Sequence, residues 1–276
     1  MTNCCGHTHV SYNEFSNEER QIINDFLERW TTGPADDIGQ QITDLLADRD
    51  IDVTDETAIR GVVERQFEEQ QGQITQLYQT HARGAALAGR RTAARRFGLE
   101  IDFDILPERA IEATEEWATT VSQEVPSSLE DEVTRFIQSA HEDGLSIPDI
   151  ADEFQENFVE GRLKDSKAEQ LARDATIGPS RQGSHSANQS APSVIAERWD
   201  TTLDGRERES HAEAHNQVVP VNGQFVVGDA LLEHPHDPTW PIEETTMCRC
   251  SAIPLFRDEL TEEQIAMIEA GERFWL

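Results

Sequence analysis

The spacing of apolar residues changes once along this 276-residue chain. Between residues 16 and 176, apolar side chains recur three and four positions apart, for example at Ile22, Ile23 and Phe26, which is the period of an amphipathic helix. Past Pro192, short runs rich in Val are separated by Gly, Asn and Pro, which is typical of strands and turns. The pattern therefore predicts an α+β protein: a mostly helical N-terminal region with long helices, followed by a small α+β C-terminal domain.

Capping and helix-breaking residues divide the helical region. The stretch 54–97 contains no Pro, so it predicts one or two long helices. Pro126 divides 107–143 into two helices, because proline cannot donate the helical hydrogen bond. The expected helices cover residues 16–32, 36–48, 54–97, 107–125, 127–143, 148–158 and 164–176.

The C-terminal region alternates short strands with turns. Strands are expected in 194–203, 217–221 and 224–227, a helical turn over 210–216, and a final helix that begins with a capping box of Thr261 and Gln264. The last three residues are apolar, and we expect them to be docked, since leaving them in water is unfavourable.

The composition of residues 177–193 predicts a linker, because it is rich in Gly, Ser and Pro. The expected divisions are therefore a flexible tail at 1–15, a helical domain at 16–176, a connector at 177–196 and the α+β domain at 197–276.

The chain is strongly acidic: 54 Asp and Glu against 23 Lys and Arg give a formal charge of −31, and only Lys164 and Lys167 are lysines. In ordinary buffer this self-repulsion opposes the compact state. Adaptation to molar salt, as in haloarchaea, explains it, because the Debye length then falls to about 3 Å. The alternative, a nucleic-acid mimic or a cation-binding protein, predicts acidic residues gathered on one face, whereas here they are spread along the chain. Molar salt also means that acidity does not exclude DNA contact.

The sequence contains no run of about 18 apolar residues, so no membrane span is expected. The N-terminus has neither a basic segment nor an apolar core, so it does not resemble a secretory signal. The cysteines form two tight pairs, Cys4-Cys5 and Cys248-x-Cys250, whose spacing fits a strain-free disulfide poorly. This favours synthesis in a reducing, intracellular compartment.

Most of the candidate chemistry lies between residues 197 and 254. His211, Cys248 and Cys250, with Asp204 or His215 as a fourth ligand, offer the nitrogen and sulfur donors that zinc prefers. The alternative is a structural set, in which His211 is a hydrogen-bonded core residue and Asp204 pairs with Arg206.

Catalysis is the weaker interpretation of the same residues. His211 and His215 are four positions apart, but the intervening order His-Ala-Glu-Ala-His is not the metalloprotease HExxH. Cys248 with His211 as its base is a conceivable nucleophile, but no group is identified for an oxyanion site. We therefore do not expect an enzyme.

A cluster of arginines ends the long Pro-free stretch. It contains Arg83, Arg90, Arg91, Arg95 and Arg96. One interpretation is a solvated face at a helix C-terminus, where cations are favoured. The other is contact with an acidic partner helix or with DNA phosphate, and the small residues beside the cluster would allow a helix to approach closely.

Several unusual residues follow one another in a distinctive order. They are Trp199, Asp204, Arg206, Arg208, His211, the run 217–220, Cys248, Arg249 and Cys250. This order and spacing resemble the C-terminal domain of the phage Mu F-like family of minor head proteins, also called head morphogenesis proteins. Upstream, a matching Ala-Glu-x-x-Ala-Arg run ends at Arg173, so the resemblance covers roughly residues 144–254. The chain departs from the family at Asp174-Ala175, where Thr-Glu is frequent.

The resemblance implies a low-copy structural protein of a tailed-virus head. The implied partners are the viral portal protein, the major capsid protein and also genomic DNA, with no membrane. The implied location is the virion, in the head interior or at the portal vertex, and the host cytoplasm during assembly. Combined with the acidity, this predicts a tailed virus or provirus of a salt-loving archaeon. The alternatives are a zinc-dependent nuclease and a nucleic-acid-binding protein that act on the viral genome. The resemblance also implies a helix, rather than a linker, over 177–193.

Overall fold

The computed structural model describes residues 15–47, 52–237, 245 and 248–276, which form two compact units. Unit 1 comprises residues 15–22, 82–117 and the described part of 174–276, and unit 2 comprises the described part of 23–81 together with 118–173. The units are not successive segments, unlike the predicted domains, because helices α1, α3, α4 and α6 each contribute residues to both. Long helices and a small sheet-containing C-terminal region confirm the predicted α+β class.

Among the described residues, seven helical elements precede the sheet. They are α1 (Asn17–Thr31), α2 (Pro34–Ala47), α3 (Glu56–Phe97), α4 (Glu108–Glu142), α5 (Ile147–Glu153), the π-helix η2 (Phe154–Ser166) and α6 (Lys167–Ser190). Ser16 begins α1 as predicted: its hydroxyl accepts a hydrogen bond from the Glu19 amide at 3.2 Å, and the Glu19 carboxylate accepts one from the Ser16 amide at 2.7 Å. Among the described helices, none combines the length and apolar character that a membrane span requires.

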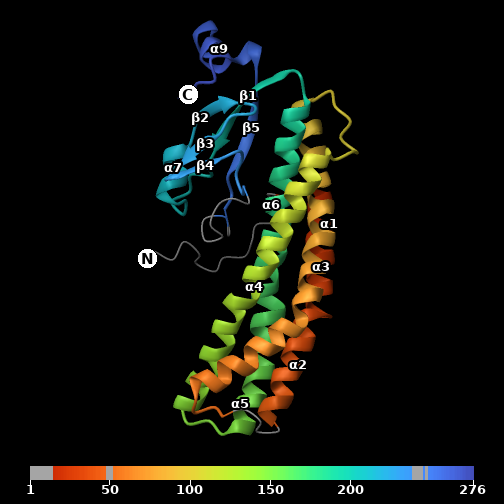
Figure 1. The fold of residues 1–276 in the computed structure, drawn as a ribbon, viewed down its shortest axis with the longest axis vertical. Helices are drawn as coiled ribbons and strands as arrows, with labels where there is room; N and C mark the ends of the chain where they lie inside the picture. Colours follow the sequence, from red (N-terminus) through yellow and green to blue (C-terminus); the bar gives the residue numbers. More distant parts are fainter. Residues whose placement is uncertain (1–14, 48–51, 238–244, 246–247) are drawn as a thin grey trace. The chain divides into compact units, whose positions relative to one another are not determined.

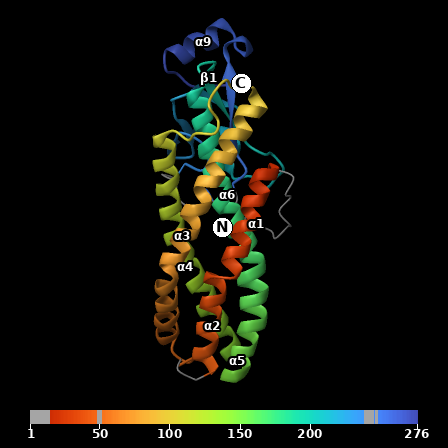
Figure 2. The ribbon, with the colours of Figure 1, turned by 90° about the vertical axis from the view of Figure 1, so that its right-hand side faces the viewer.

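Aromatic side chains fill the core of unit 2. Phe26 meets Tyr78 edge to face, with ring centroids 5.2 Å apart, and Phe154 stacks on Phe158 at 5.1 Å. Helices α2 and α5 lie side by side in this unit (Figures 1 and 2). A Cβ on Gly39 of α2 would lie 2.5 Å from the side chain of Val159, so glycine permits this close approach of α2 to η2.

Helix α4 continues through Pro126, so the prediction of two helices over 107–143 is wrong. Proline removes the N–H that would bond to the carbonyl four residues earlier, which is that of Ser122. The Gln71 side chain of α3 donates to this carbonyl at 3.1 Å. A neighbouring helix therefore satisfies the group that the proline leaves without a helical partner.

The π-helix η2 connects α5 to α6 without a break, where the sequence predicts two separate short helices. A π-helix shifts the backbone hydrogen bonds by one residue and alters which carbonyls face neighbouring helices. Here the indole N–H of Trp30, whose side chain is fully buried, donates to the Leu163 carbonyl at 3.1 Å. This bond ties α1 to η2 inside unit 2.

The predicted connector at 177–196 is instead helix up to Ser190, and strand β1 begins at Val194. Its small residues serve close packing and not flexibility. A Cβ on Gly183 would lie 1.8 Å from the Ala86 carbonyl oxygen of α3, and one on Gly89 would lie 2.0 Å from the Ser180 carbonyl oxygen. Helices α3 and α6 therefore touch backbone to backbone within unit 1, which side chains larger than hydrogen would prevent.

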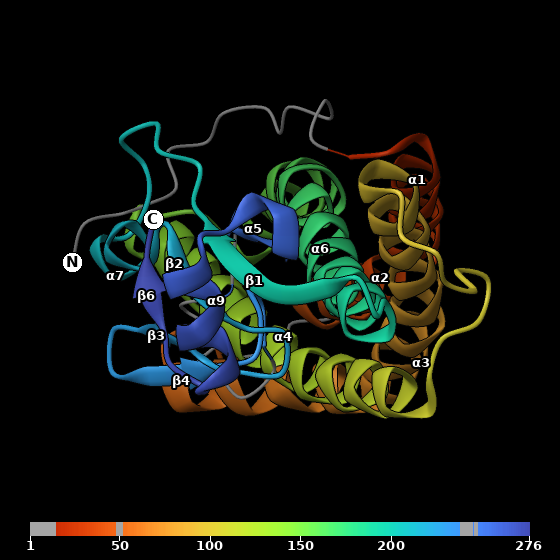
Figure 3. The same ribbon diagram turned by 90° about the horizontal axis from the view of Figure 1, so that it is seen from above.

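The sheet of unit 1 has four antiparallel strands in the order β5-β1-β2-β6, and β3 and β4 form a separate hairpin. Figure 3 shows β1 leading on from the end of α6. The elements are β1 (Val194–Asp200), α7 (Glu209–Ala214), β2 (Gln217–Pro220), β3 (Phe225–Val227), β4 (Ala230–Leu232), β5 (Ser251–Phe256), the 3-10 helix η3 (Arg257–Glu259), α9 (Glu262–Glu269) and β6 (Phe274–Trp275).

Residues of strand β1 belong to three clusters of buried side chains, of which Val194 joins one with Ala93, Ala94, Leu99, Ala187 and Ala191. Ala196 packs with Val218 and with Ile268 of α9, whereas Trp199 packs with Phe225 and the hairpin. The capping box of Thr261 begins α9 as predicted. The C-terminus is docked only in part. Phe274 is buried, and the next strand residue, Trp275, faces the opposite way and is 53% exposed. Leu276, which follows the strand, is 50% exposed.

We predict that Gly89→Ala destabilises unit 1, because the added methyl group overlaps the Ser180 backbone of α6. Overpacking of this kind costs about 1–3 kcal/mol or more. The matched control is Gly84→Ala on the same helix, where the new methyl group lies 3.7 Å from Ile22 in ordinary contact. Urea unfolding of both variants is the measurement, and equal stabilities would contradict the close packing of α3 on α6.

Candidate functional site

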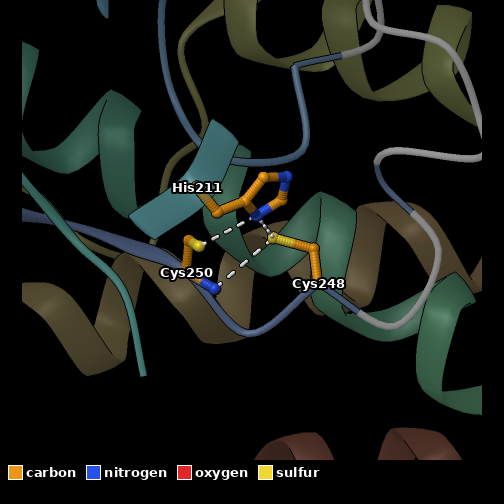
Figure 4. A group of neighbouring side chains, drawn as sticks. All are labelled: His211, Cys248 and Cys250. Atoms are coloured by element: carbon orange, nitrogen blue, oxygen red, sulfur yellow. Dashed lines mark hydrogen bonds between the residues drawn. The ribbon is translucent and has the colours of Figure 1, made fainter. Parts of the chain in front are cut away.

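The candidate site lies in unit 1, where three elements bring its side chains together. Strand β1 carries Trp199, α7 carries His211, and the segment that leads into β5 carries Cys248 and Cys250. Each of these four side chains is at most 2% exposed. Trp199 packs with Cys248 and Cys250 in one buried cluster. Figure 4 shows His211, Cys248 and Cys250 facing one another.

The imidazole of His211 faces both thiols. Its Nδ1 lies 3.3 Å from the Cys250 Sγ and 3.7 Å from the Cys248 Sγ, and the three donor atoms all lie within 4.8 Å of one another. Both cysteines are free thiols, and the Cys250 amide donates to the Cys248 sulfur at 3.4 Å (Figure 4). One nitrogen and two sulfur atoms thus converge on a common point.

A hydrogen-bonded support holds the His211 backbone. The Trp199 indole donates to the Thr201 hydroxyl at 3.1 Å, and that hydroxyl donates to the His211 carbonyl at 2.7 Å. The Trp199 ring also meets the His211 ring edge to face, with centroids 6.3 Å apart. The orientation of His211 is therefore determined by β1 and not by solvent.

The two thiols differ in acidity. A hydrogen bond between them raises the pKa of Cys248 well above its usual value and lowers the pKa of Cys250 to about 5. Burial opposes ionisation of both, and the His211 ring adds to the lowering at Cys250. Cys250 is therefore the more acidic of the two thiols.

The structure places two other predicted ligands outside this cluster. Asp204 forms a bidentate ion pair with Arg249, in which both nitrogen-to-oxygen distances are 2.7 Å. It also accepts a hydrogen bond from Arg206 at 2.5 Å. These arginines, Arg249 first, hold the pKa of Asp204 well below its usual range. His215 accepts from the Thr201 amide at 3.1 Å. The ion pair of Asp204 with Arg206, predicted as a structural alternative, is thus present and includes Arg249.

A second buried cluster is centred on Glu197 of β1, which was not among the predicted site residues. Glu197 has no exposed surface, and its two carboxylate oxygens meet the His185 Nδ1 at 2.8 Å and the Asn188 amide at 2.7 Å, both from α6. An isolated buried carboxylate is very unfavourable, so partners are obligatory. By strand alternation Glu197 shares a face with the apolar Ile195 and Trp199, and this was the indication available in the sequence.

The turn after β4 extends this cluster toward the surface. Glu233 lies 3.9 Å from the His185 ring and accepts two hydrogen bonds from Arg109, at 2.8 and 2.9 Å. His234 lies 2.7 Å from the Gln182 side chain, and Arg109, Glu233 and His234 line a cavity of about 370 Å³. His236 approaches the Cys248 carbonyl at 3.0 Å, so one short turn contacts both clusters.

The pKa values of the two histidines in this cluster, His185 and His234, are shifted in opposite directions. Burial works against protonation of His185, but the charges and hydrogen bonds of Glu197 and Glu233 outweigh it and raise the pKa of His185 to about 9. Burial, together with the charge on His185, lowers the pKa of His234 to about 4. At neutral pH the first is therefore a cation and the second is neutral.

The predicted arginine cluster is largely engaged within unit 1. Arg90 is 3% exposed and donates to the Asp102 and Ser186 carbonyls, so the expectation of a surface contact does not hold for it. Packing of α6 on α3 encloses it. Arg83 pairs with Glu115, and Arg91 pairs with Glu18 and Asp104. Arg95 and Arg96 are exposed and lie over the rings of Phe103 and Phe97. Among the other family-motif positions, Arg173 is buried in α6, and Arg208 occupies the N-cap position of α7.

A family model described as "Phage Mu protein F like protein" matches residues 129–253. The match supports the phage Mu F-like family, and it begins within α4, further upstream than the resemblance in the sequence motifs. It includes both buried clusters except for Arg109. Comparison with curated proteins and with solved structures gave no match.

We predict that stability depends on pH with a maximum between the two histidine pKa values. Because the pKa of His185 is raised from 6.5 to about 9 on folding, its contribution is complete below pH 6.5 and is lost as the pH rises through 9, by roughly 3 kcal/mol. Because the pKa of His234 is lowered to about 4, its contribution is complete above pH 6.5 and is lost as the pH falls toward 4. Denaturant unfolding at several pH values measures both limbs.

His185→Gln should flatten the alkaline limb, whereas His141→Gln, a change at a histidine of unit 2, should leave it unchanged. An alkaline limb that persists in His185→Gln would show that another group titrates.

Proposed function

We propose that this protein is a minor structural protein of a tailed-virus head that acts with the portal and capsid proteins during head assembly, DNA packaging or DNA delivery. The observation that carries the proposal is the family match over residues 129–253. This range includes the buried cluster around His211 and, apart from Arg109, the buried cluster around Glu197. Four residues of the motif that resembles the phage Mu F-like family lie together in one buried cluster: Trp199, His211, Cys248 and Cys250.

The burial of the site favours a structural role over catalysis. His211, Cys248 and Cys250 are each 2% exposed, so a polymer such as DNA has no access to them. His215, the other histidine of the nuclease alternative, accepts a backbone hydrogen bond from Thr201. A nuclease needs its reacting groups within hydrogen-bond reach of substrate. We therefore propose a rigid folded element and not an enzyme.

Nucleic-acid binding is the second candidate, and the exposed pair Arg95 and Arg96 is the observation in its favour. The rest of the arginine cluster is occupied by carboxylates or by backbone carbonyls. With so few cations available, DNA would gain little from release of its counterions. Contact with protein is the better-supported use of this surface.

We further propose that the protein is adapted to molar salt. The formal charge is −31, and both lysines are used in ion pairs within unit 2. Lys164 pairs with Asp36 and Glu160, and Lys167, whose side chain is 8% exposed, pairs with Glu132. Both lysines are thus placed where they neutralise neighbouring carboxylates. A salt-loving archaeal host fits this distribution of charge.

The proposed head role predicts that the chain co-purifies with virus heads and with a portal ring when the two are co-expressed in molar KCl. Mass spectrometry of purified heads should find it at a copy number below that of the major capsid protein. Abundance in infected cells together with absence from heads would contradict the proposal.

The head role predicts no retention of DNA in molar KCl. The nucleic-acid alternative predicts retention that Arg95→Ala/Arg96→Ala abolishes. It also predicts that the control variant Arg65→Ala, at an exposed arginine of the same helix, keeps this retention.

Salt adaptation predicts that the unfolding temperature at pH 7 rises as KCl increases from about 0.1 M to about 1 M, because the Debye length shortens from about 10 Å to about 3 Å. Calorimetry measures the midpoint. Near the pI of about 4.5 the net charge is small, so the same increase in salt should change the midpoint less. A midpoint at pH 7 that does not respond to salt would contradict the proposal.

A further inference from the structure

The donor atoms of the His211, Cys248 and Cys250 cluster are arranged as ligands. They belong to two chain segments, α7 and the lead into β5, and all point toward one another inside the core (Figure 4). We propose that His211 Nδ1, Cys248 Sγ and Cys250 Sγ bind a zinc ion. This site is independent of the head role, and it would remain if the protein had another function.

The two nitrogen-to-sulfur distances fit ligands of a single ion. Zinc binds sulfur at about 2.3 Å and imidazole nitrogen at about 2.0–2.1 Å, so neighbouring ligands of a tetrahedral ion lie about 3.5–3.8 Å apart. The His211 Nδ1 lies 3.3 Å from one sulfur and 3.7 Å from the other. A fourth ligand would come from solvent or from another side chain.

Charge favours a divalent ion in this position. Two thiolates and a neutral imidazole carry a charge of about −2, which Zn²⁺ cancels, so the buried assembly is neutral and avoids the large cost of an isolated buried charge. The soft sulfur donors select zinc over Mg²⁺ or Ca²⁺, which prefer oxygen ligands. The Cys250 amide that donates to the Cys248 sulfur would further stabilise a bound thiolate.

The surroundings already hold the ligands in place. Thr201 donates to the His211 carbonyl, and Arg249, between the two cysteines, is fixed by its two bonds to Asp204. An ion would join α7 to the β5 lead across a separation of 37 residues between His211 and Cys248. Closing a loop of this length through a metal stabilises the folded chain relative to the unfolded one.

The test measures metal on the full chain, produced with zinc in the medium and purified in KCl without chelator. Elemental analysis of the wild type should find about one zinc per chain. Cys248→Ser and Cys250→Ser should lose most of it. The matched control Cys4→Ser/Cys5→Ser makes the same chemical change at the other cysteine pair and should keep it.

A second measurement does not depend on whether the cysteine variants fold. In Cys4→Ser/Cys5→Ser, only the two site thiols remain, and a thiol reagent should react with them rapidly only after a zinc chelator is added. The chelator should also lower the unfolding temperature, since zinc binds the folded state. Cobalt in place of zinc should give the absorption of a thiolate-to-cobalt transition.

Three results would overturn the site. They are a wild-type chain without metal after purification in zinc, a Cys248–Cys250 disulfide as the native state, and zinc that stays in both site variants but is lost from Cys4→Ser/Cys5→Ser.

Discussion

The fully buried carboxylate of Glu197 is the constraint on which unit 1 depends. A charge in that position is tolerated only when α6 presents His185 and Asn188 to its two oxygens, so strand β1 has one acceptable position on the helix. Two residues further along the same strand, Trp199 packs in the cluster that contains Cys248 and Cys250. Its indole donates to the Thr201 hydroxyl, which in turn donates to the His211 carbonyl. The orientation of the thiol and imidazole groups therefore follows from an ion pair that lies outside the cluster itself.

The turn from Glu233 to Asp237 couples the two clusters. Glu233 and His234 join it to the ionic cluster, and His236, with a left-handed φ of 65°, reaches the Cys248 carbonyl. A non-glycine residue in that conformation is unfavourable by itself and persists where surrounding contacts determine it. Three contacts that hold this turn involve a charged or imidazole group: Glu233 with His185, His234 with Gln182, and His236 with the Cys248 carbonyl. A change of protonation in the Glu197 cluster and a change of ligand in the His211 cluster would therefore act on the same segment. This explains why polar residues are concentrated where a small sheet would otherwise need only apolar ones.

Local sequence patterns correctly predicted the features that depend on interactions between residues close together in the chain. The class of fold, the starts of α1 and α9, the turn at α7 and strands β1, β2 and β3 depended on caps, periodicity and turn residues, all of which are short-range. Two errors in the helical region share one cause, which is tertiary compensation. Pro126 does not end α4, because Gln71 supplies the missing donor, and the glycines of 177–190 serve helix contact and not flexibility. For the site, residue types predicted His211, Cys248 and Cys250, but only the fold shows that Asp204 and His215 have other partners and that Glu197 matters.

The distribution of charge also limits how this protein can recognise others. Much of its cationic charge is used internally, by Arg90, Arg91, Lys164 and Lys167. In molar salt the remaining carboxylates act over only about 3 Å, so they contribute little to steering a partner. Apolar area is then the main source of affinity, since burial of apolar surface does not rely on charge. Among the described residues, the large apolar side chains that are half exposed or more all belong to unit 1, and the proposed contact with portal or capsid protein would draw on them: Ile105, Leu203, Leu231, Trp275 and Leu276.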